Sequence, residues 1–201
     1  DLDSATMLDI AEELDEEALS DLAEEMDLDD AADLLGDLSD EQSARVLDSM
    51  EDSEAAEVRA LLDHPEDTGG GIMTSQLVSV SEGATVAEAI SRLREWTDDE
   101  DDLYLYVVDQ AEQLVGTVPL TRLLFVLPES PIREITVRDL IVIRSDMDQE
   151  EVAWIFADYD LLALPVVDGG GRMIGRVTID DIVDVIEEEA TEDIYGMAGI
   201  S

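Results

Sequence analysis

The acidic side chains near the carboxyl end of the chain are its strongest candidates for binding chemistry. Residues 181–194 read DIVDVIEEEATEDI, and half of them are aspartate or glutamate. The acids that share a helical face, three or four residues apart, fall into two rows: Glu189, Glu192 and Asp193, and Asp181, Asp184 and Glu188. Carboxylate oxygens are ligands that Mg²⁺ takes from proteins while it retains several waters. The pattern indicates either a cation site or a solvated acidic face, and spacing alone favours the solvated face.

Other chemistries are excluded by residue types that the sequence lacks. It contains no cysteine and no lysine, which excludes disulfides, zinc–thiolate sites and nucleophiles of either type. Its single histidine, His64, cannot build a histidine metal cluster within one chain, and we expect it to be an ordinary side chain at a domain boundary. No set of nucleophile and base is present, so we do not expect an enzyme. No apolar run is long enough to span a bilayer, which predicts a soluble polypeptide.

Net charge narrows the possible partners. Aspartate and glutamate number 54 against 10 basic residues, all of them arginine, and the formal charge is −44. Such a charge repels nucleic acid and anionic lipid, whose binding depends on lysine and arginine contacts with phosphate. Two interpretations remain: a cation-binding protein, or a surface adapted to molar salt, where the Debye length falls to about 3 Å. The spread of acid along the whole chain and the absence of lysine favour salt adaptation as the background.

The elements that position these acids begin with a repeat of period 12. Its units start at Leu2, Leu14, Met26, Leu38 and Met50, and an aliphatic residue recurs eight positions into each unit: Ile10, Leu22, Leu34, Val46 and Val58. Ser39 and Gln42 have the spacing of a capping box. The repeat predicts helices of about 8–10 residues that must stack on one another to be stable, and therefore a small all-α superhelix over residues 1–63.

A second, longer repeat follows a glycine-rich segment at 64–74. LYVVDQAEQLVGTV at 105–118 aligns on LPVVDGGGRMIGRV at 164–177, 59 residues later, and the upstream parts align with an offset of 64. The difference places extra residues of the first copy in an acidic loop at 97–102. Each copy is expected to form strand, helix, VVD strand, turn, G-x-V strand and closing helix, so this part is α/β. The glycines at 169–171 are expected to form a hairpin turn, because no phosphate-loop motif surrounds them. Trp154 and Tyr159 are expected in the core or at a domain interface.

These motifs together carry a resemblance. Two copies of L-x-VVD followed by G-x-V-T/P-x-x-D/R resemble a tandem pair of CBS domains. With the acidic helical repeat, the linker PEDTGGGIMT and the tail EEEATEDIYGMAGIS, the chain resembles the cytosolic region of the MgtE family of magnesium transporters. The fold implied is α+β and multidomain, with these parts: helical N domain 1–63, linker 64–74, CBS domains 75–128 and 129–186, and the start of a connecting helix 187–201. The resemblance implies a fragment that lies at the cytoplasmic face of the membrane, joined to a missing transmembrane channel domain, and that forms a homodimer through its CBS domains.

The resemblance also implies a set of Mg²⁺ ligands and a mechanism. On the helical domain the ligands implied are Asp29, Asp30 and Asp33; on the second CBS domain and connecting helix they are Asp160, Asp181, Asp184, Glu188, Glu189, Glu192 and Asp193. With Mg²⁺ bound, the helical domain, CBS pair and connecting helix dock and the channel closes. When Mg²⁺ is scarce, the acids repel one another and the channel opens.

An adenine-nucleotide sensor is the main alternative, and a structural scaffold is another. CBS pairs commonly bind adenine nucleotides through T-x-x-D, which Thr178 and Asp181 provide in the second copy. The first copy carries Pro119 and Arg122 at these positions, and Leu161 stands where relatives could stack an aromatic ring on adenine. Tyr104 is a further candidate for contact with ATP. In this alternative the acids only solubilise the protein.

Overall fold

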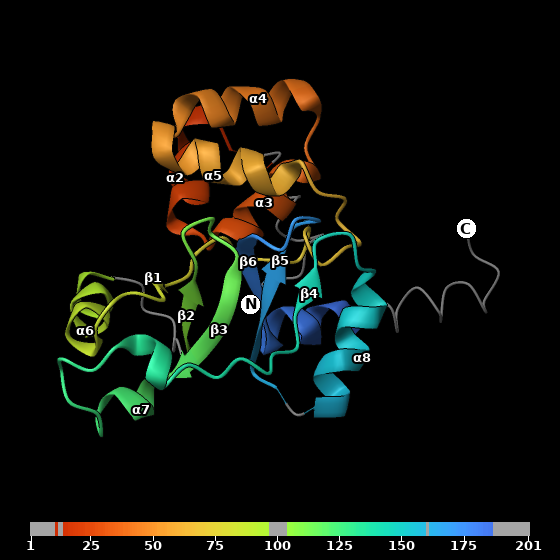
Figure 1. Cartoon of the computed structure of the whole chain (residues 1–201). Helices are drawn as coiled ribbons and strands as arrows, with labels where there is room; N and C mark the ends of the chain where they lie inside the picture. Colours follow the sequence, from red (N-terminus) through yellow and green to blue (C-terminus); the bar gives the residue numbers. More distant parts are fainter. Residues whose placement is uncertain (1–10, 12–13, 97–103, 160, 187–201) are drawn as a thin grey trace.

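Residues 16–62 form a stack of four short helices (Figure 1). A computed structural model describes residues 11, 14–96, 104–159 and 161–186. The helices are α2 (Glu16–Glu25), α3 (Leu28–Gly36), α4 (Asp40–Ser49) and α5 (Asp52–Leu62). Their first residues are 12 positions apart, which confirms the repeat and the predicted helix length.

Buried aliphatic side chains and local caps explain why each repeat unit folds as a helix. Leu34, Val46 and Val58, each eight residues into its unit, are buried in the hydrophobic core. Asp15 caps α2 by accepting a hydrogen bond from the backbone N–H of Ala18. The capping box expected at Ser39 does not form, because its hydroxyl donates to the Gln42 side chain at 2.6 Å. The apolar repeat therefore contributes more to these helices than their caps do.

The rest of the chain forms two copies of one α/β unit. The first contains β1 (Ser79–Ser81), α6 (Val86–Glu95), β2 (Tyr104–Val108), β3 (Leu114–Pro119) and α7 (Leu120–Leu123). A 3₁₀ turn, Ile132–Glu134, leads to the second, which contains β4 (Ile143–Arg144), α8 (Gln149–Tyr159), β5 (Ala163–Val167), β6 (Met173–Thr178) and a helix over residues 179–186. Each sheet has one parallel and one antiparallel pair, in the orders β1-β2-β3 and β4-β5-β6. The predicted order of elements is confirmed.

The two sheets have the same register. Val107 pairs with Gly116 and Val166 pairs with Gly175, and in both sheets the register shifts immediately after the valine. Residues that are 59 positions apart in the sequence therefore occupy equivalent positions in the two sheets. The glycine run at 169–171 forms the predicted hairpin turn, with Gly171 in the left-handed region at φ 81°.

The two copies are interlaced through the segments that precede them. Thr74, before the first copy, pairs with Arg176 of the second, while Val137, before the second copy, pairs with Thr117 of the first. At Gly175 a Cβ atom would lie 2.7 Å from the Thr74 carbonyl oxygen, so a side chain there would clash with the crossing backbone. Each sheet is therefore completed by the segment that leads into the other copy.

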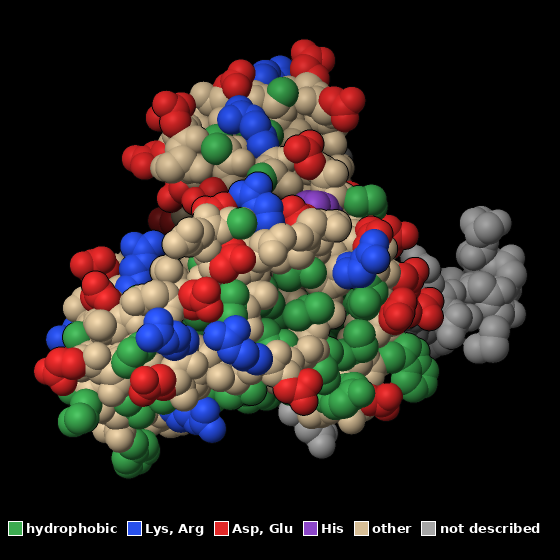
Figure 2. Space-filling view, viewed as in Figure 1, with side chains coloured by type: hydrophobic (Ala, Val, Ile, Leu, Met, Phe, Trp, Pro, Cys, Tyr) green, Lys and Arg blue, Asp and Glu red, His purple; other side chains and the backbone are tan. Residues whose placement is uncertain are grey.

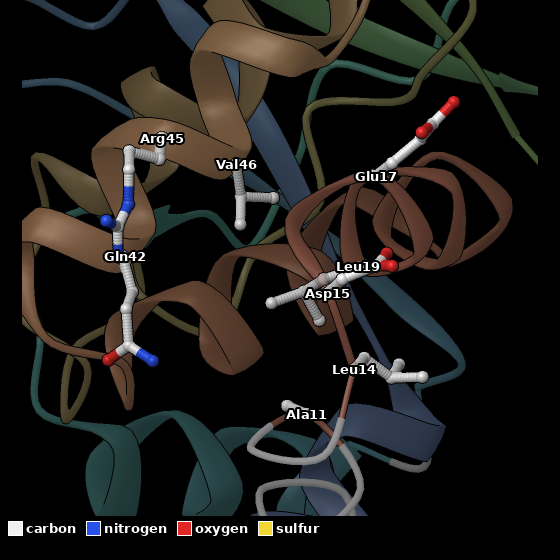
Figure 3. Close-up of a pocket in the computed structure, with 8 residues that line it drawn as sticks. All are labelled: Ala11, Leu14, Asp15, Glu17, Leu19, Gln42, Arg45 and Val46. Atoms are coloured by element: carbon white, nitrogen blue, oxygen red, sulfur yellow. The ribbon is translucent and has the colours of Figure 1, made fainter.

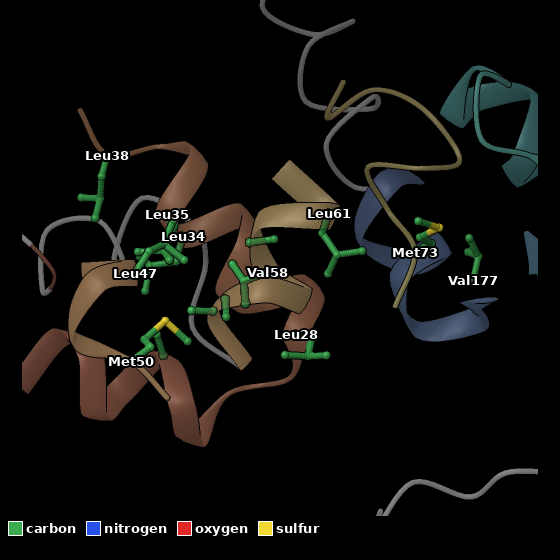
Figure 4. Packing of buried hydrophobic residues seen from close by; sticks show 14 of the residues in the cluster. Leu28, Leu34, Leu35, Leu38, Leu47, Met50, Val58, Leu61, Met73 and Val177 are labelled. Carbon is green, nitrogen blue, oxygen red and sulfur yellow. The ribbon is translucent and has the colours of Figure 1, made fainter. Parts of the chain in front are cut away.

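The linker attaches the helical domain to the second copy. Gly69 N–H donates to the Met147 carbonyl at 2.7 Å, and Gly70 N–H donates to the Ser145 carbonyl at 3.0 Å. The hydrophobic core of the helical domain continues into the second copy, where Leu61, Met73 and Val177 lie along the junction (Figure 4). The first copy has a separate core. The helical domain therefore packs on the copy that is more distant in sequence.

Two of the aromatic residues expected in the core or at an interface are exposed. Trp154 and Tyr159, both on α8, expose 69% and 60% of their surface. Neither belongs to the core of this chain, because the apolar positions of α8 that face the sheet are Val152 and Phe156.

Candidate metal centre

The first turn of α3 faces the helix formed by residues 179–186, and carboxylates of the two domains approach one another there. Asp29 and Asp30 occupy that turn, where the helix dipole favours negative charge. Asp181 lies within the electrostatic influence of Asp29, and Asp30 lies within that of Asp184. Domain packing thus brings together four of the acids that the family resemblance singled out.

Asp181 is held in place by the residue that ends β6. The backbone N–H of Thr178 donates to Oδ2 of Asp181 at 2.7 Å, and the Thr178 hydroxyl donates to the same oxygen at 2.8 Å. The hydroxyl also contacts the carboxylate of Asp180. Since Asp181 is the third residue of its helix, these bonds satisfy a backbone donor at the helix start and fix the direction of the carboxyl group.

Burial and like charge make the Asp29–Asp181 pair difficult to ionise completely. Burial raises the pKa of Asp29 to about 6. Burial, and then the charge of Asp29, raises the pKa of Asp181 to about 8, although the hydrogen bonds from Thr178 oppose this rise. Near neutral pH the pair therefore retains a proton, because two ionised carboxylates at this interface would repel each other without the full screening of water.

The pair has the donor set that a magnesium ion needs. Oδ1 of Asp29 is buried and has no hydrogen-bond partner within the described structure. In the same described ranges no three acidic or histidine side chains are grouped so that they could hold a metal together. Mg²⁺ commonly binds through one or two carboxylates and keeps the rest of its coordination shell as water. Asp29 and Asp181 fit that kind of site, and they do not fit a closed cage.

The remaining predicted ligands are placed as follows. Asp33 lies one turn further along α3 and is exposed. Predicted ligands that lie outside the described residues are Asp160, Glu188, Glu189, Glu192 and Asp193.

Two further acids belong to this interface and were missed from the sequence. After burial, Asp27 makes the largest contribution to raising the pKa of Asp30, and Asp180 also contributes. Asp27 precedes the first residue of α3, and Asp180 precedes Asp181 in TIDD. Both residues are close in sequence to predicted ligands, and this proximity could have identified them from the sequence.

The residues considered for nucleotide contact lie in different surroundings. Leu161 packs against the hydrophobic core, and Tyr104 is half-buried at the start of β2. Thr178 and Asp181 are joined by the hydrogen bonds described above. In the first copy, Arg122 donates to the carbonyl of Ile135 at 3.1 Å.

A pocket of about 480 Å³ lies in the helical domain, away from these residues (Figure 3). Its lining side chains come from α2, α4 and the residues before α2: Ala11, Leu14, Asp15, Glu17, Leu19, Gln42, Arg45 and Val46. No candidate ligand lines it. Half of the lining residues are charged or polar, and the position between α2 and α4 is typical of a gap between stacked helices.

Known protein families and a solved structure match this architecture. Residues 1–67 match the family model of the MgtE intracellular N domain, and residues 70–129 and 132–188 match that of the CBS domain. A crystal structure described as the cytosolic domain of the Mg²⁺ channel MgtE in complex with ATP aligns with a TM-score of 0.84. It is 38% identical, and the alignment covers 92% of this chain and 76% of that one. The chain belongs to the MgtE family.

Curated relatives show how much of an MgtE protein the chain represents. The magnesium transporter MgtE of Thermus thermophilus is 44% identical over 144 residues, which are 71% of this chain and 32% of the relative. That of Bacillus subtilis is 36% identical over 68% of this chain and 30% of its own length. The chain thus spans about a third of these relatives and corresponds to the cytosolic region of MgtE, a helical N domain followed by two CBS domains. None of its described helices has the length and apolar character that crossing a membrane requires.

Proposed function

We propose that the chain is the Mg²⁺-sensing regulatory region at the cytoplasmic face of a magnesium transporter. The observation that carries the proposal is the meeting of Asp29 on the N domain with Asp181 on the second CBS domain, in a pair that resists full ionisation. A divalent cation supplies positive charge that lets both carboxylates ionise while the domains stay docked. Without it, deprotonation of the pair favours separation.

Repulsion between two close carboxylates is in general large enough for a switch. Two unit charges 4 Å apart repel by about 1 kcal/mol in water and by about 4 kcal/mol at an effective dielectric constant of 20. A coupling free energy of 1–3 kcal/mol changes an affinity by roughly 5–150-fold. The requirement is that Mg²⁺ bind the docked state more tightly than the open one.

The proposal extends to acids and boundaries that the structure does not test. Asp160, Glu188, Glu189, Glu192 and Asp193 are proposed to bind Mg²⁺ between the second CBS domain and a connecting helix starting near residue 187. The domain boundaries proposed from the sequence are 1–63, 64–74, 75–128 and 129–186. The surplus surface acid is proposed to be an adaptation to molar salt, so the switch should be assayed in high KCl.

We propose that the chain forms a homodimer through its CBS domains and is joined to its own transmembrane domain. The segments that follow β3 and β6 expose apolar side chains at equivalent positions, although those of the first copy lie just beyond the end of α7: Leu124 matches Val183, and Leu127 matches Ile186, both 59 residues apart. Hydrophobic side chains also gather over α8, where Trp154 is exposed (Figure 2). Contiguous exposed apolar surface of this kind marks protein interfaces.

An adenine nucleotide is a second candidate ligand, because the related MgtE cytosolic domain was crystallised with ATP. The residues proposed to contact it are Tyr104, Leu161, Thr178 and Asp181. Isothermal titration of ATP with and without Mg²⁺ tests this. Binding that persists without Mg²⁺ and is lost in Asp181→Asn supports a nucleotide site, and absence of heat in both conditions contradicts it.

A Mg²⁺ titration followed by small-angle scattering tests the main proposal. At fixed high KCl and constant ionic strength, the radius of gyration should fall as Mg²⁺ is added. Asp29→Asn should raise the midpoint at least tenfold. The matched control is Glu41→Gln, because Glu41 occupies the same repeat position on α4, 12 residues later, and is exposed. A radius that is independent of Mg²⁺, or equal effects of both substitutions, contradicts the proposal.

A further inference from the structure

Thr178 distinguishes the CBS domain on which the N domain docks from the other one. Its backbone N–H donates to Oδ2 of Asp181, and its hydroxyl, which carries one hydrogen, lies within hydrogen-bond distance of the same oxygen and of the Asp180 carboxylate. The equivalent position of the first copy, 59 residues earlier, is Pro119, which has neither an N–H nor a hydroxyl, and Arg122 replaces the aspartate. The paired donors therefore occur in the copy whose helix meets α3.

Two donors on one carboxylate oxygen restrict the rotation of the whole group. Oδ2 is occupied by Thr178, and Oδ1 lies outside this pair of bonds. A carboxylate that is already oriented loses less conformational entropy when it binds an ion. Residues that orient metal ligands in this way typically change metal affinity by 10–100-fold when they are mutated.

We propose that Thr178 is a positioning residue, which holds Asp181 in the orientation that meets Asp29 across the domain interface. The proposal rests on the Mg²⁺-sensing function proposed above. It adds that Mg²⁺-driven docking depends on one hydroxyl group that does not itself touch the ion.

A purely structural role as a helix cap is the competing explanation, and the chain contains a matched control for it. At the start of α6, the Thr85 N–H and hydroxyl donate to Oε2 of Glu88 at 2.7 and 2.8 Å, the same distances as in the Thr178–Asp181 pair. Glu88 is fully exposed on the first CBS domain. Removing the Thr85 hydroxyl therefore removes an equivalent cap from a helix of the other copy.

The experiment compares Thr178→Val, Thr178→Ser and Thr85→Val in the 201-residue chain. For each, the Mg²⁺ midpoint of compaction is measured by small-angle scattering at constant ionic strength, and the urea midpoint of unfolding is measured in EDTA. Thr178→Val should raise the Mg²⁺ midpoint roughly tenfold, and Thr178→Ser, which keeps the hydroxyl, should stay within about twofold of wild type. Thr85→Val should lower the urea midpoint and leave the Mg²⁺ midpoint unchanged.

Each result bears on the proposal. A Thr178→Val chain with the wild-type Mg²⁺ midpoint, or a Thr85→Val chain with an equal shift, overturns the positioning role while leaving Mg²⁺ sensing intact. A wild-type chain that never compacts overturns both. If Thr178→Val does not fold, Thr178→Ala removes the hydroxyl without adding volume and is measured in the same way.

Discussion

Replacing Asp181 by asparagine should stabilise the chain in the absence of Mg²⁺. The side chain of asparagine keeps an oxygen to accept the hydrogen bonds from Thr178, and it carries no charge to be buried beside Asp29. In the wild type the pKa of Asp181 rises from 3.8 to about 8 on folding. Because the folded state binds the proton more tightly, this group contributes most stability below pH 4 and loses that contribution as the pH rises through about 8.

The size of the effect follows from the pH interval. Each pH unit between the unfolded and folded pKa values costs about 1.4 kcal/mol, so at pH 7 the penalty that asparagine avoids is at most about 4 kcal/mol. Asp181 is half-buried and shares its proton with Asp29, so solvent screening reduces the gain. We expect about 2 kcal/mol at pH 7.

Urea unfolding in EDTA at fixed KCl, measured at pH 4, 6 and 8, tests this expectation. The two proteins should be equally stable at pH 4, and the free energy of unfolding of Asp181→Asn should exceed that of the wild type increasingly towards pH 8. Added Mg²⁺ should stabilise the wild type far more than the variant. Glu41→Gln, the exposed control, should follow the wild type at every pH. An Asp181→Asn protein that is less stable than wild type at pH 8, or equally responsive to Mg²⁺, would refute the reasoning.

Three further predictions concern the acidic pair, the crossing of the two sheets and the dimer interface. The Mg²⁺ concentration at the midpoint of compaction should decrease as the pH is raised from 6 to 8.5, because the ion displaces the proton of the acidic pair. Calorimetry in buffers of different ionisation enthalpy should detect the released proton. A midpoint that does not change with pH contradicts this. Gly175→Ala should lower the free energy of unfolding by about 1–3 kcal/mol, because its Cβ would meet the Thr74 carbonyl. Gly169→Ala is the control, because Gly169 faces open space, and it should cost under about 1 kcal/mol. Equal losses in the two variants would show that the crossing backbone moves freely. Leu124→Glu should convert a dimer to a monomer in light scattering without changing the urea midpoint. A dimer of unchanged affinity would exclude the segment after α7 from the interface.

Sequence patterns predicted most of the helices and strands, because these elements depend mainly on residues that are close together in the sequence. The period of 12 predicted short stacked helices, and the offset of 59 predicted two copies with one order of elements, which the structure shows to have the same register. Side-chain detail was less predictable: Ser39 has capping-box spacing but donates to the side chain of Gln42, and Trp154 lies at an apolar position of α8 yet is exposed.

The candidate site depends on contacts between residues far apart in the sequence, which local sequence patterns do not predict. Asp29 and Asp181 are on different domains, and only the family resemblance linked them before the structure brought them together. The docking of the N domain on the second CBS domain depends on backbone bonds of Gly69 and Gly70 to residues more than 70 positions away. Such pairings follow from three-dimensional packing, so charge and periodicity could not predict them.

The interlacing of the two sheets also sets an order of events during synthesis. The sheet of the first copy can be completed when Val137 leaves the ribosome, because its partner Thr117 has already emerged. Thr74 emerges earlier than either, but its partner Arg176 is among the last described residues to be made. Domains form as the chain emerges from its amino terminus, so the N domain can fold early and must then wait for its docking surface. The interface between the N domain and the second CBS domain consequently assembles after the N domain and the sheet of the first copy.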